Sequence, residues 1–176
     1  MYFFFYRFEE QFILPRSYSG RATQGYWGWI SGNFCGELVP VNRRQTAVDY
    51  LEILDNVLVP TVTAIYGNQQ RINIIEDNSS VHTADIVKNW YRDHPLFNRL
   101  DMPPRSPDIN VIENCWAEMV REWRPTMARN HDELMERVNE AWEELRHRPH
   151  YFRSLTDSMP KRLQKIIDVG GAHINY

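Results

Sequence analysis

Two carboxylates, Asp77 and Glu113, occupy positions from which acidic side chains could do chemistry. Asp77 comes just after the short apolar run Ile72–Ile75, and open α/β sheets collect their binding sites beyond the carboxyl ends of strands. Glu113 lies beside the apolar residues Ile112 and Trp116 of a predicted helix, where a carboxylate is costly unless a partner or a cation neutralises it. If the two carboxylates converge at a strand end, they supply the oxygen ligands that Mg²⁺ or Mn²⁺ prefers.

Both residues also have ordinary structural explanations. Asp77 and Asn78 favour a turn, and a turn is expected where a strand ends. Glu113 could form an ion pair with an arginine such as Arg153. The residue types and their places alone leave the metal site and these structural roles open.

The first third of the chain is predicted to form strands. The aromatic-rich segment Tyr2–Leu14 alternates like a strand, and further strands are expected at Tyr26–Ser31 and Gly36–Val39. The pair Gly32–Asn33 suits the short turn between the latter two, as in a hairpin. Pro40 is expected to limit the third strand, because proline cannot donate a backbone hydrogen bond.

The middle of the chain alternates helices and strands. Apolar residues recur with a helical period over Thr46–Leu58, and Pro60 is expected to stop this helix. A short strand at Arg71–Ile75, a helix at His82–Asp93 and a strand at Phe97–Met102 follow. Helices that connect strands in this order favour parallel pairing after the antiparallel start.

The last third is predicted to be helical. The pair Ser106–Pro107 supplies a favourable N-cap and first residue for the helix that carries Glu113. Asn130 with Glu133 resembles a capping box that opens another helix, and a last helix covers about Pro160–Val169. The whole chain is therefore expected to form an α/β domain with a mixed five-stranded sheet and flanking helices, the element order of the ribonuclease H-like fold.

Length and composition indicate one globular domain, residues 1–176. The net charge of −3 argues against a broad DNA-binding surface, so any nucleic-acid contact is expected to be local. Cys35 and Cys115 have no metal-type spacing and are expected to be reduced thiols. The apolar run Tyr2–Tyr6 is too short to span a membrane, so no membrane partner is expected and the nucleus or the cytoplasm is the predicted location.

Two segments resemble the carboxylate motifs of the mariner-superfamily (Tc-type) DDE transposases. Residues Ile74–Thr83, which read IIEDNSSVHT, resemble the motif around that family's second aspartate. Residues Pro103–Trp116, which read PPRSPDINVIENCW, are similar to its third-carboxylate motif. The 35 residues between Asp77 and Glu113 suit the branch whose triad ends in glutamate. Weaker likenesses are found at Trp27–Ser31, Tyr50–Leu54, Ser158–Arg162 and Gly170.

The resemblance implies a catalytic-core domain for two-metal phosphoryl transfer on DNA. In that family three carboxylates bind two Mg²⁺ or Mn²⁺ ions about 4 Å apart, and the reaction cuts transposon ends and joins them to target DNA. Asp77 and Glu113 would be the second and third metal ligands, while Asn78, His82 and Asn110 match the motifs as supporting residues. DNA as the partner, a homodimer as the assembly and the nucleus as the location follow as expectations.

The first carboxylate of the triad is where this sequence departs from the family pattern. Counting back from Phe12–Leu14, which resembles the end of the family's first strand, places Phe8 at the aspartate position. Glu9 should point to the opposite face of the strand, and Glu10 is displaced by about 7 Å along it, so neither replaces the aspartate unless a bulge re-aims Glu9. We therefore expect an incomplete triad.

Three functions are open at this point. The first is a transposase-type domain for metal-dependent DNA strand cleavage and transfer, as a fragment or relic with an incomplete triad and without the family's N-terminal helix-turn-helix region. The second is a non-catalytic domain that binds nucleic acid or another protein, which the phenylalanine at position 8 favours. The third is a ribonuclease H-like nuclease acting on RNA–DNA hybrids, against which the motif at Ser106–Trp116 argues.

Overall fold

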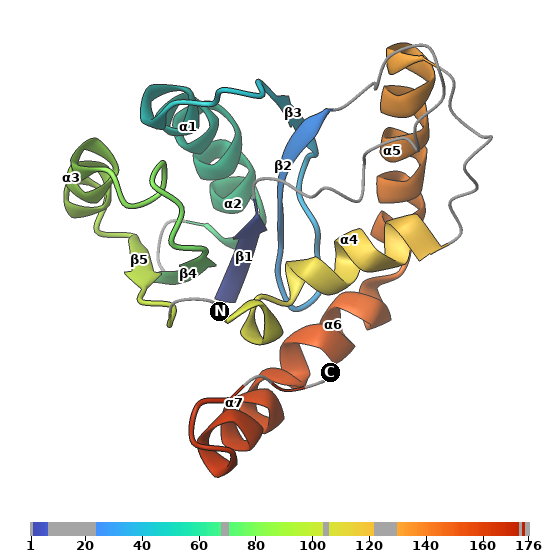
Figure 1. Ribbon diagram of the computed structural model, residues 1–176. Coiled ribbons are helices and arrows are strands. Elements are labelled where there is room, and N and C mark those ends of the chain that lie inside the picture. The colour runs from blue at the N-terminus through green and yellow to red at the C-terminus, as the bar shows by residue number, and fades with distance from the viewer. Residues whose placement is uncertain are drawn as a thin grey trace.

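A mixed sheet forms the centre of the molecule (Figure 1). The computed structural model describes residues 2–6, 24–67, 71–103, 106–121, 130–172 and 174. The strands of the sheet lie in the order β3-β2-β1-β4-β5. They are β1 (Tyr2–Tyr6), β2 (Gly25–Ile30), β3 (Val39–Val41), β4 (Ile72–Glu76) and β5 (Phe97–Leu100).

The strand directions bring three carboxyl ends to one edge of the sheet. β1 pairs antiparallel with β2, and β2 with β3, whereas β4 runs parallel to both β1 and β5. Phe5 is the register partner of Glu76, and Ile75 is the partner of Leu100. The ends of β1, β4 and β5 therefore lie side by side, and Asp77 follows directly from this edge.

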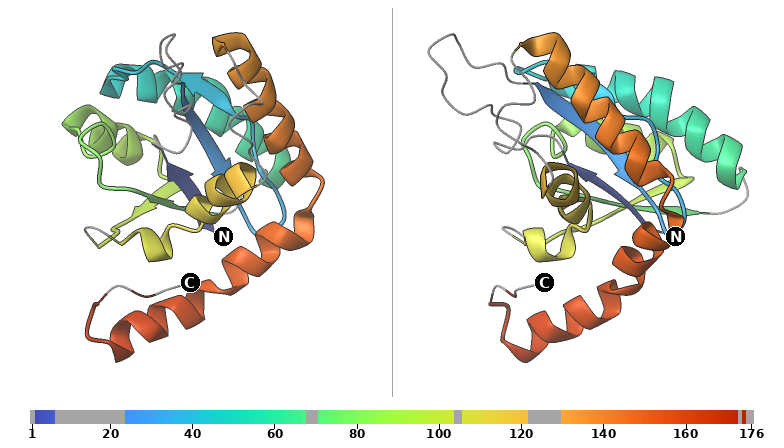
Figure 2. Two further views of the ribbon diagram at one scale, coloured as in Figure 1. Left: turned by 45° about the vertical axis from the view of Figure 1, so that its right-hand side comes forward. Right: turned by 90° about the vertical axis from the view of Figure 1, so that its right-hand side faces the viewer.

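Helices cover both faces of the sheet (Figures 1 and 2). One face carries α1 (Ala47–Ile53), the π-helical turn η2 (Leu54–Leu58), α2 (Val59–Tyr66) and α3 (Asp85–Asp93). The other face carries α4 (Ile112–Arg121) and α5 (His131–Arg146), followed by α6 (Pro149–Asp157) and α7 (Met159–Asp168); the 3₁₀ turn η3 (Pro107–Ile109) precedes α4. Each face has its own buried core, and within the described ranges every helix is too short or too polar to span a bilayer.

The elements around Asp77 are confirmed with slightly different ends. The strand predicted at Arg71–Ile75 is β4, shifted by one residue, and β5 ends at Leu100 instead of Met102. The helix predicted from His82 begins at Asp85. Of the first predicted strand, residues 2–6 form β1, and residues 7–14 lie outside the described part of the chain.

The first helix does not stop at Pro60, contrary to the prediction. It continues through η2 into α2 and ends at Tyr66. The wider π turn is closed by the Val59 amide, which donates to the carbonyl of Leu54 five residues earlier. Pro60 then stands in the first turn of α2, where a missing amide hydrogen is tolerated.

The third strand was also predicted too early. It spans Val39–Val41 and contains Pro40, which lies opposite Tyr26 of β2. β3 is the edge strand of the sheet, where a proline can turn its nitrogen away from the neighbouring strand. A proline is therefore tolerated within a strand where no neighbouring strand needs its amide hydrogen.

Gly36, expected to lie in that strand, instead packs flat against an indole ring. Its amide donates to the carbonyl of Trp29 at 2.9 Å, and its carbonyl accepts a hydrogen bond from Trp142 Nε1 at 2.9 Å. A Cβ atom at this position would lie 1.9 Å from Trp29 Nε1. Only glycine fits here, so the loop that joins β2 to β3 is locked against the sheet and α5.

The helical last third is confirmed with one change at its start. The pair Ser106–Pro107 leads only into the 3₁₀ turn η3, and the helix that carries Glu113 begins at Ile112. Asn130 caps α5 as predicted, because its Oδ1 accepts the Glu133 amide at 2.9 Å and its Nδ2 donates to Glu133 Oε1 at 3.0 Å. The prediction lacks α6.

Candidate functional site

Asp77 is the first residue beyond β4, and its carboxylate is held by one oxygen. Oδ1 accepts a hydrogen bond from His82 Nδ1 at 2.6 Å and another from the Ser79 amide at 3.0 Å. The second bond closes a tight turn after the strand, as expected for Asp77 followed by Asn78. Both bonds end on Oδ1, no hydrogen bond from the described residues ends on Oδ2, and the side chain is 27% exposed.

His82 is fully buried and fixes Asp77 from within the core. Its ring packs on that of Tyr50, with centroids 4.5 Å apart, and its Nε2 is buried without a hydrogen-bond partner among the described residues. Burial lowers the pKa of His82, but the carboxylates of Glu76 and Asp77 outweigh this and raise that pKa. Burial raises the pKa of Asp77, yet the bond and charge of His82 and the Ser79 amide hold it below its ordinary value. Asp77 is thus kept ionised, as a metal ligand must be.

Glu76 is a fully buried carboxylate that the sequence analysis does not single out. It is the last residue of β4. Arg99 Nε donates to its Oε1 at 2.5 Å, while the hydroxyls of Tyr50 and Tyr91 donate to its Oε2. The one sequence signal for this network is an arginine in the strand next to β4, since Arg99 is the register partner of Ile74.

Asn78 joins the two loops that leave the sheet edge. Its Nδ2 donates to the carbonyl of Met102 at 2.6 Å. Because Met102 follows β5, this bond ties the loop after β4 to the loop after β5. Asn78 therefore holds in place the loop that follows Asp77.

Glu113 lies half-buried in the first turn of α4 and is held by Asn110. The Asn110 carbonyl accepts the Glu113 amide at 3.1 Å, and Asn110 Nδ2 donates to Glu113 Oε1 at 3.1 Å. Asn110 is itself buried, so it fixes both the backbone and the side chain of Glu113. Arg153, the alternative partner, donates instead to Asn33 Oδ1, from Nε at 2.9 Å and from Nη2 at 2.6 Å.

The packing of α4 places it at the sheet edge beyond which Asp77 lies. α4 contacts β1, and the right-hand view of Figure 2 shows it beside the end of β1 to which the arrow points. β1 in turn pairs in parallel with β4. The Asp77 loop and the helix of Glu113 therefore both lie near this edge of the sheet.

The side chains near this edge include oxygen ligands of the type that divalent cations bind. Carboxylate oxygens of Asp77 and Glu113 are the hard ligands that Mg²⁺ and Mn²⁺ prefer. Among the described residues, no group of three or more histidine, cysteine, aspartate or glutamate side chains stands ready to hold a metal ion. Phe8, Glu9 and Glu10, the residues that bear on a third carboxylate, lie outside the described residues.

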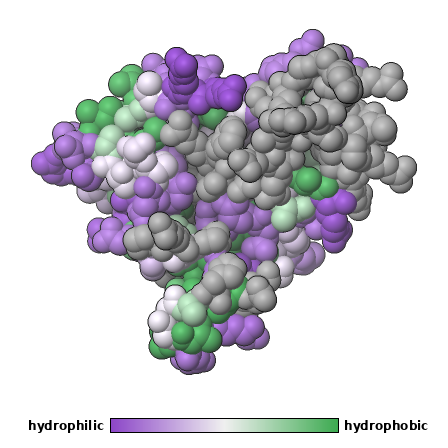
Figure 3. All heavy atoms as spheres, viewed as in Figure 1, coloured by the Kyte–Doolittle hydropathy of each residue, from purple (hydrophilic) through white to green (hydrophobic). Residues whose placement is uncertain are grey.

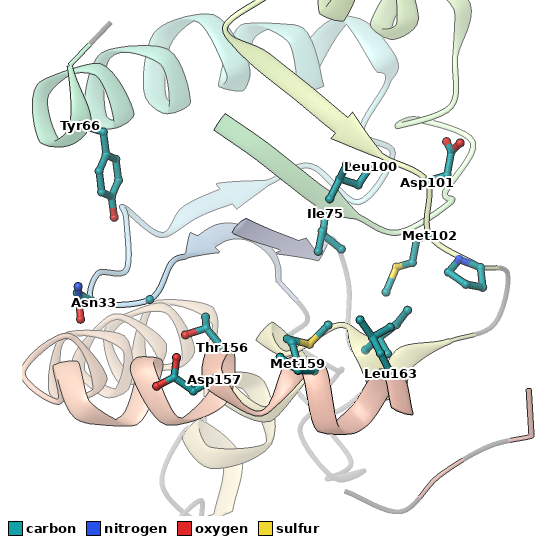
Figure 4. Close-up of a pocket in the computed structure, with 14 residues that line it drawn as sticks. Asn33, Tyr66, Ile75, Leu100, Asp101, Met102, Thr156, Asp157, Met159 and Leu163 are labelled. Carbon is teal, nitrogen blue, oxygen red and sulfur yellow. The ribbon is translucent and has the colours of Figure 1, made fainter. Parts of the chain in front are cut away.

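A cavity of about 1000 Å³ opens beside this edge (Figure 4). Ile75 and Leu100 line it from the strands, and Met159 and Leu163 line it from α7. The cavity lies between the sheet edge and α7, and neither Asp77 nor Glu113 is among the residues that line it.

Comparisons of sequence identify related proteins. The profile of the family described as "DDE superfamily endonuclease" matches residues 40–135. The transposable element Tcb1 transposase of Caenorhabditis briggsae is 29% identical over 170 residues, which are 97% of this chain and 60% of that protein. The transposable element Tc1 transposase of Caenorhabditis elegans is 28% identical over 173 residues, again 97% and 60%. The chain therefore spans about 60% of the length of these curated relatives.

Comparisons of structure agree. The catalytic domain of the Mos1 mariner transposase matches with a TM-score of 0.75 at 14% identity, over 99% of this chain and 84% of that one. A Mos1 transposase paired-end complex with the left transposon end matches with a TM-score of 0.77 at 16% identity, over 92% of this chain and 47% of that one. At such identities the likeness shows the fold alone, and it confirms the predicted ribonuclease H-like α/β class.

Proposed function

The chain belongs to the DDE superfamily endonucleases, as a transposase domain of the Tc1/mariner type, and we propose that Asp77 and Glu113 bind divalent cations for DNA strand cleavage and transfer. We propose further that the site is incomplete as it stands, because phenylalanine occupies the position of the first aspartate.

One observation carries the proposal. The carboxylate of Asp77 is held through Oδ1 by a buried histidine and a backbone amide, and no hydrogen bond from the described residues occupies Oδ2, just beyond the carboxyl end of the parallel strand β4. Ligand carboxylates are commonly hydrogen-bonded in this way to groups behind them.

Each residue of the site then has a part in the chemistry. Asp77 and Glu113 would hold the cations, whose chemistry would be the activation of a water or a DNA 3′-hydroxyl and the stabilisation of the oxygen that leaves. His82 orients Asp77, and Asn110 orients Glu113, so neither carboxylate needs to reorganise when a cation arrives. Asn78 holds the two loops below them together.

DNA is the partner that this proposal requires. The solved Mos1 complexes include a paired-end complex with a transposon end, which supports DNA as the partner of this chain as well. The net charge of −3 favours a local contact near the carboxylates over a broad basic surface. A homodimer and a nuclear location belong to the same proposal.

The phenylalanine at position 8 favours a second candidate function. A phenyl ring supplies no oxygen ligand, so a domain that has lost one carboxylate could persist as a non-catalytic module that binds nucleic acid or a protein. The two candidates differ in whether an aspartate at position 8 creates activity.

Plasmid nicking in Mn²⁺ separates them. We expect no nicking by the unsubstituted chain above the level of Asp77→Ala, nicking by Phe8→Asp, and its loss in Phe8→Asp combined with Asp77→Ala. Asp93→Ala, which removes an exposed acid from α3, is the matched control and should leave the Phe8→Asp activity intact. Nicking by the unsubstituted chain that vanishes in Asp77→Ala would show that the site is complete without position 8. Inactive Phe8→Asp would favour the non-catalytic module.

A further inference from the structure

The turn before α4 decides where Glu113 points. η3 ends at Ile109, and the next residue, Asn110, holds Glu113 through both its carbonyl and its side-chain amide. Asn110 is 2% exposed and cannot move without disturbing the core around it. Asp108 lies two residues before Asn110. Contacts that hold the backbone of Asp108 therefore also restrict the position of Glu113.

Arg162 and Ile174, late in the chain, both donate hydrogen bonds to Asp108. Arg162 Nη1 donates to the carbonyl of Asp108 at 2.8 Å, and the amide of Ile174 donates to Asp108 Oδ2 at 2.8 Å. Arg162 is in turn steadied by Ser158, whose Oγ accepts from Arg162 Nε at 2.8 Å. These bonds join parts of the chain that lie 54 and 66 residues apart in sequence.

Arg162 is the one residue of α7 that is buried, although it is charged. It is 3% exposed, whereas Leu163 is 45% and Ile167 is 69% exposed on the same helix. Figure 3 shows hydrophobic surface at the bottom of the molecule, where α7 lies in Figure 1. The cavity in Figure 4 lies between α7 and the strands, so α7 meets the rest of the fold chiefly through α6 and η3. A buried guanidinium is costly, and from Nη1 this one donates a hydrogen bond to the turn in front of Glu113.

We propose that Arg162 is a positioning residue for the third carboxylate, and that α7 with Ile174 forms a clamp on η3 that sets the orientation of Glu113. The metal part of this inference rests on the proposed function. The clamp itself does not.

Amide hydrogen exchange tests the clamp without any metal. In Arg162→Ala we expect exchange over residues 109–114 to become at least tenfold faster, because the amides of Glu113 and Asn114 bond to carbonyls within this turn. Lys161→Ala, which removes a charge from an exposed neighbour on the same helix, should leave these rates unchanged. Unchanged exchange in Arg162→Ala would overturn the clamp. Arg162→Lys, which keeps the charge but not the planar fork, should fold and give an intermediate rate.

Mn²⁺ affinity, measured by the loss of the free-ion electron paramagnetic resonance signal, tests the positioning role. In the Phe8→Asp background, Arg162→Ala should weaken Mn²⁺ binding about tenfold, the lower end for residues that support metal ligands. Combined with Glu113→Gln, it should add no further loss, since Arg162 acts through Glu113. Equal losses in both backgrounds, or none, would overturn the positioning role. If Asp77→Ala and Glu113→Gln do not change Mn²⁺ binding, the proposed function fails, and hydrogen exchange still decides the clamp.

Discussion

Replacing Glu76 with glutamine should destabilise the fold strongly, although the change removes only a charge. The carboxylate is fully buried and accepts hydrogen bonds from Arg99, Tyr50 and Tyr91. Glutamine keeps the shape of the side chain but leaves the Arg99 guanidinium, itself 16% exposed, without its counter-charge.

The expected loss in the free energy of unfolding follows from the cost of leaving a buried charge without its ionic partner. Removing one partner of a buried ion pair typically costs about 3–5 kcal/mol of the free energy of unfolding. Glutamine can still accept from one or two of the donors, so we expect the lower end, about 3 kcal/mol. For a domain of this size that corresponds to a fall in Tm of about 6–12 °C.

Urea unfolding followed by tryptophan fluorescence measures the effect. The matched control is Glu143→Gln on the surface of α5, where Glu143 is 54% exposed and pairs with Arg146 at 2.9 Å. This change should cost less than about 0.5 kcal/mol. The comparison isolates burial, because both variants remove one carboxylate that is paired with an arginine.

A double-mutant cycle closes the test. Arg99→Met should also destabilise, and Glu76→Gln combined with Arg99→Met should cost at least about 2 kcal/mol less than the sum of the single changes. A loss below about 1 kcal/mol for Glu76→Gln, or additive losses in the cycle, would refute the reasoning that Arg99 compensates the buried charge.

Two further predictions concern packing and thiol chemistry. Gly36→Ala should cost about 2–3 kcal/mol in urea unfolding, because its Cβ would lie 1.9 Å from Trp29 Nε1. Gly32→Ala, where the nearest atom would be 3.6 Å away, should change stability by less than about 0.5 kcal/mol, and equal effects would contradict the packing argument. Burial raises the pKa of Cys35 to about 11 and that of Cys115 well above its ordinary value. Both thiols should therefore react with an aromatic disulfide reagent roughly a hundredfold more slowly at pH 8 in the native protein than in urea, and rapid native labelling would contradict their burial.

The chain order and the pairing directions of the sheet could be predicted because they follow from local patterns. The alternation of apolar runs with helical periods, and caps such as Asn130, depend on a few neighbouring residues. Local sequence rules would end a strand at Pro40 and a helix at Pro60, but both elements continue past these residues. Pro40 is tolerated because β3 lies at the sheet edge, and Pro60 because a π turn precedes it. Both conditions depend on tertiary structure.

The sequence could single out the candidate ligands of the site but not the contacts that hold them. Asp77 and Glu113 could be singled out from their places beside apolar segments and from the family resemblance. The buried network of Glu76 and the grip of Arg162 on Asp108 could not, because each joins residues far apart in the chain. A single sequence carries no signal for such pairs beyond the presence of opposite charges.

The most direct test of the central claim is a crystal structure of the Phe8→Asp protein soaked in Mn²⁺, with the metal located by its anomalous scattering. We expect an anomalous peak with carboxylate oxygens of Asp77 and Glu113 both within about 2.0–2.6 Å, the range of divalent cation–oxygen bonds. A peak elsewhere, or carboxyl groups of residues 77 and 113 that point to different faces of the sheet, would contradict it.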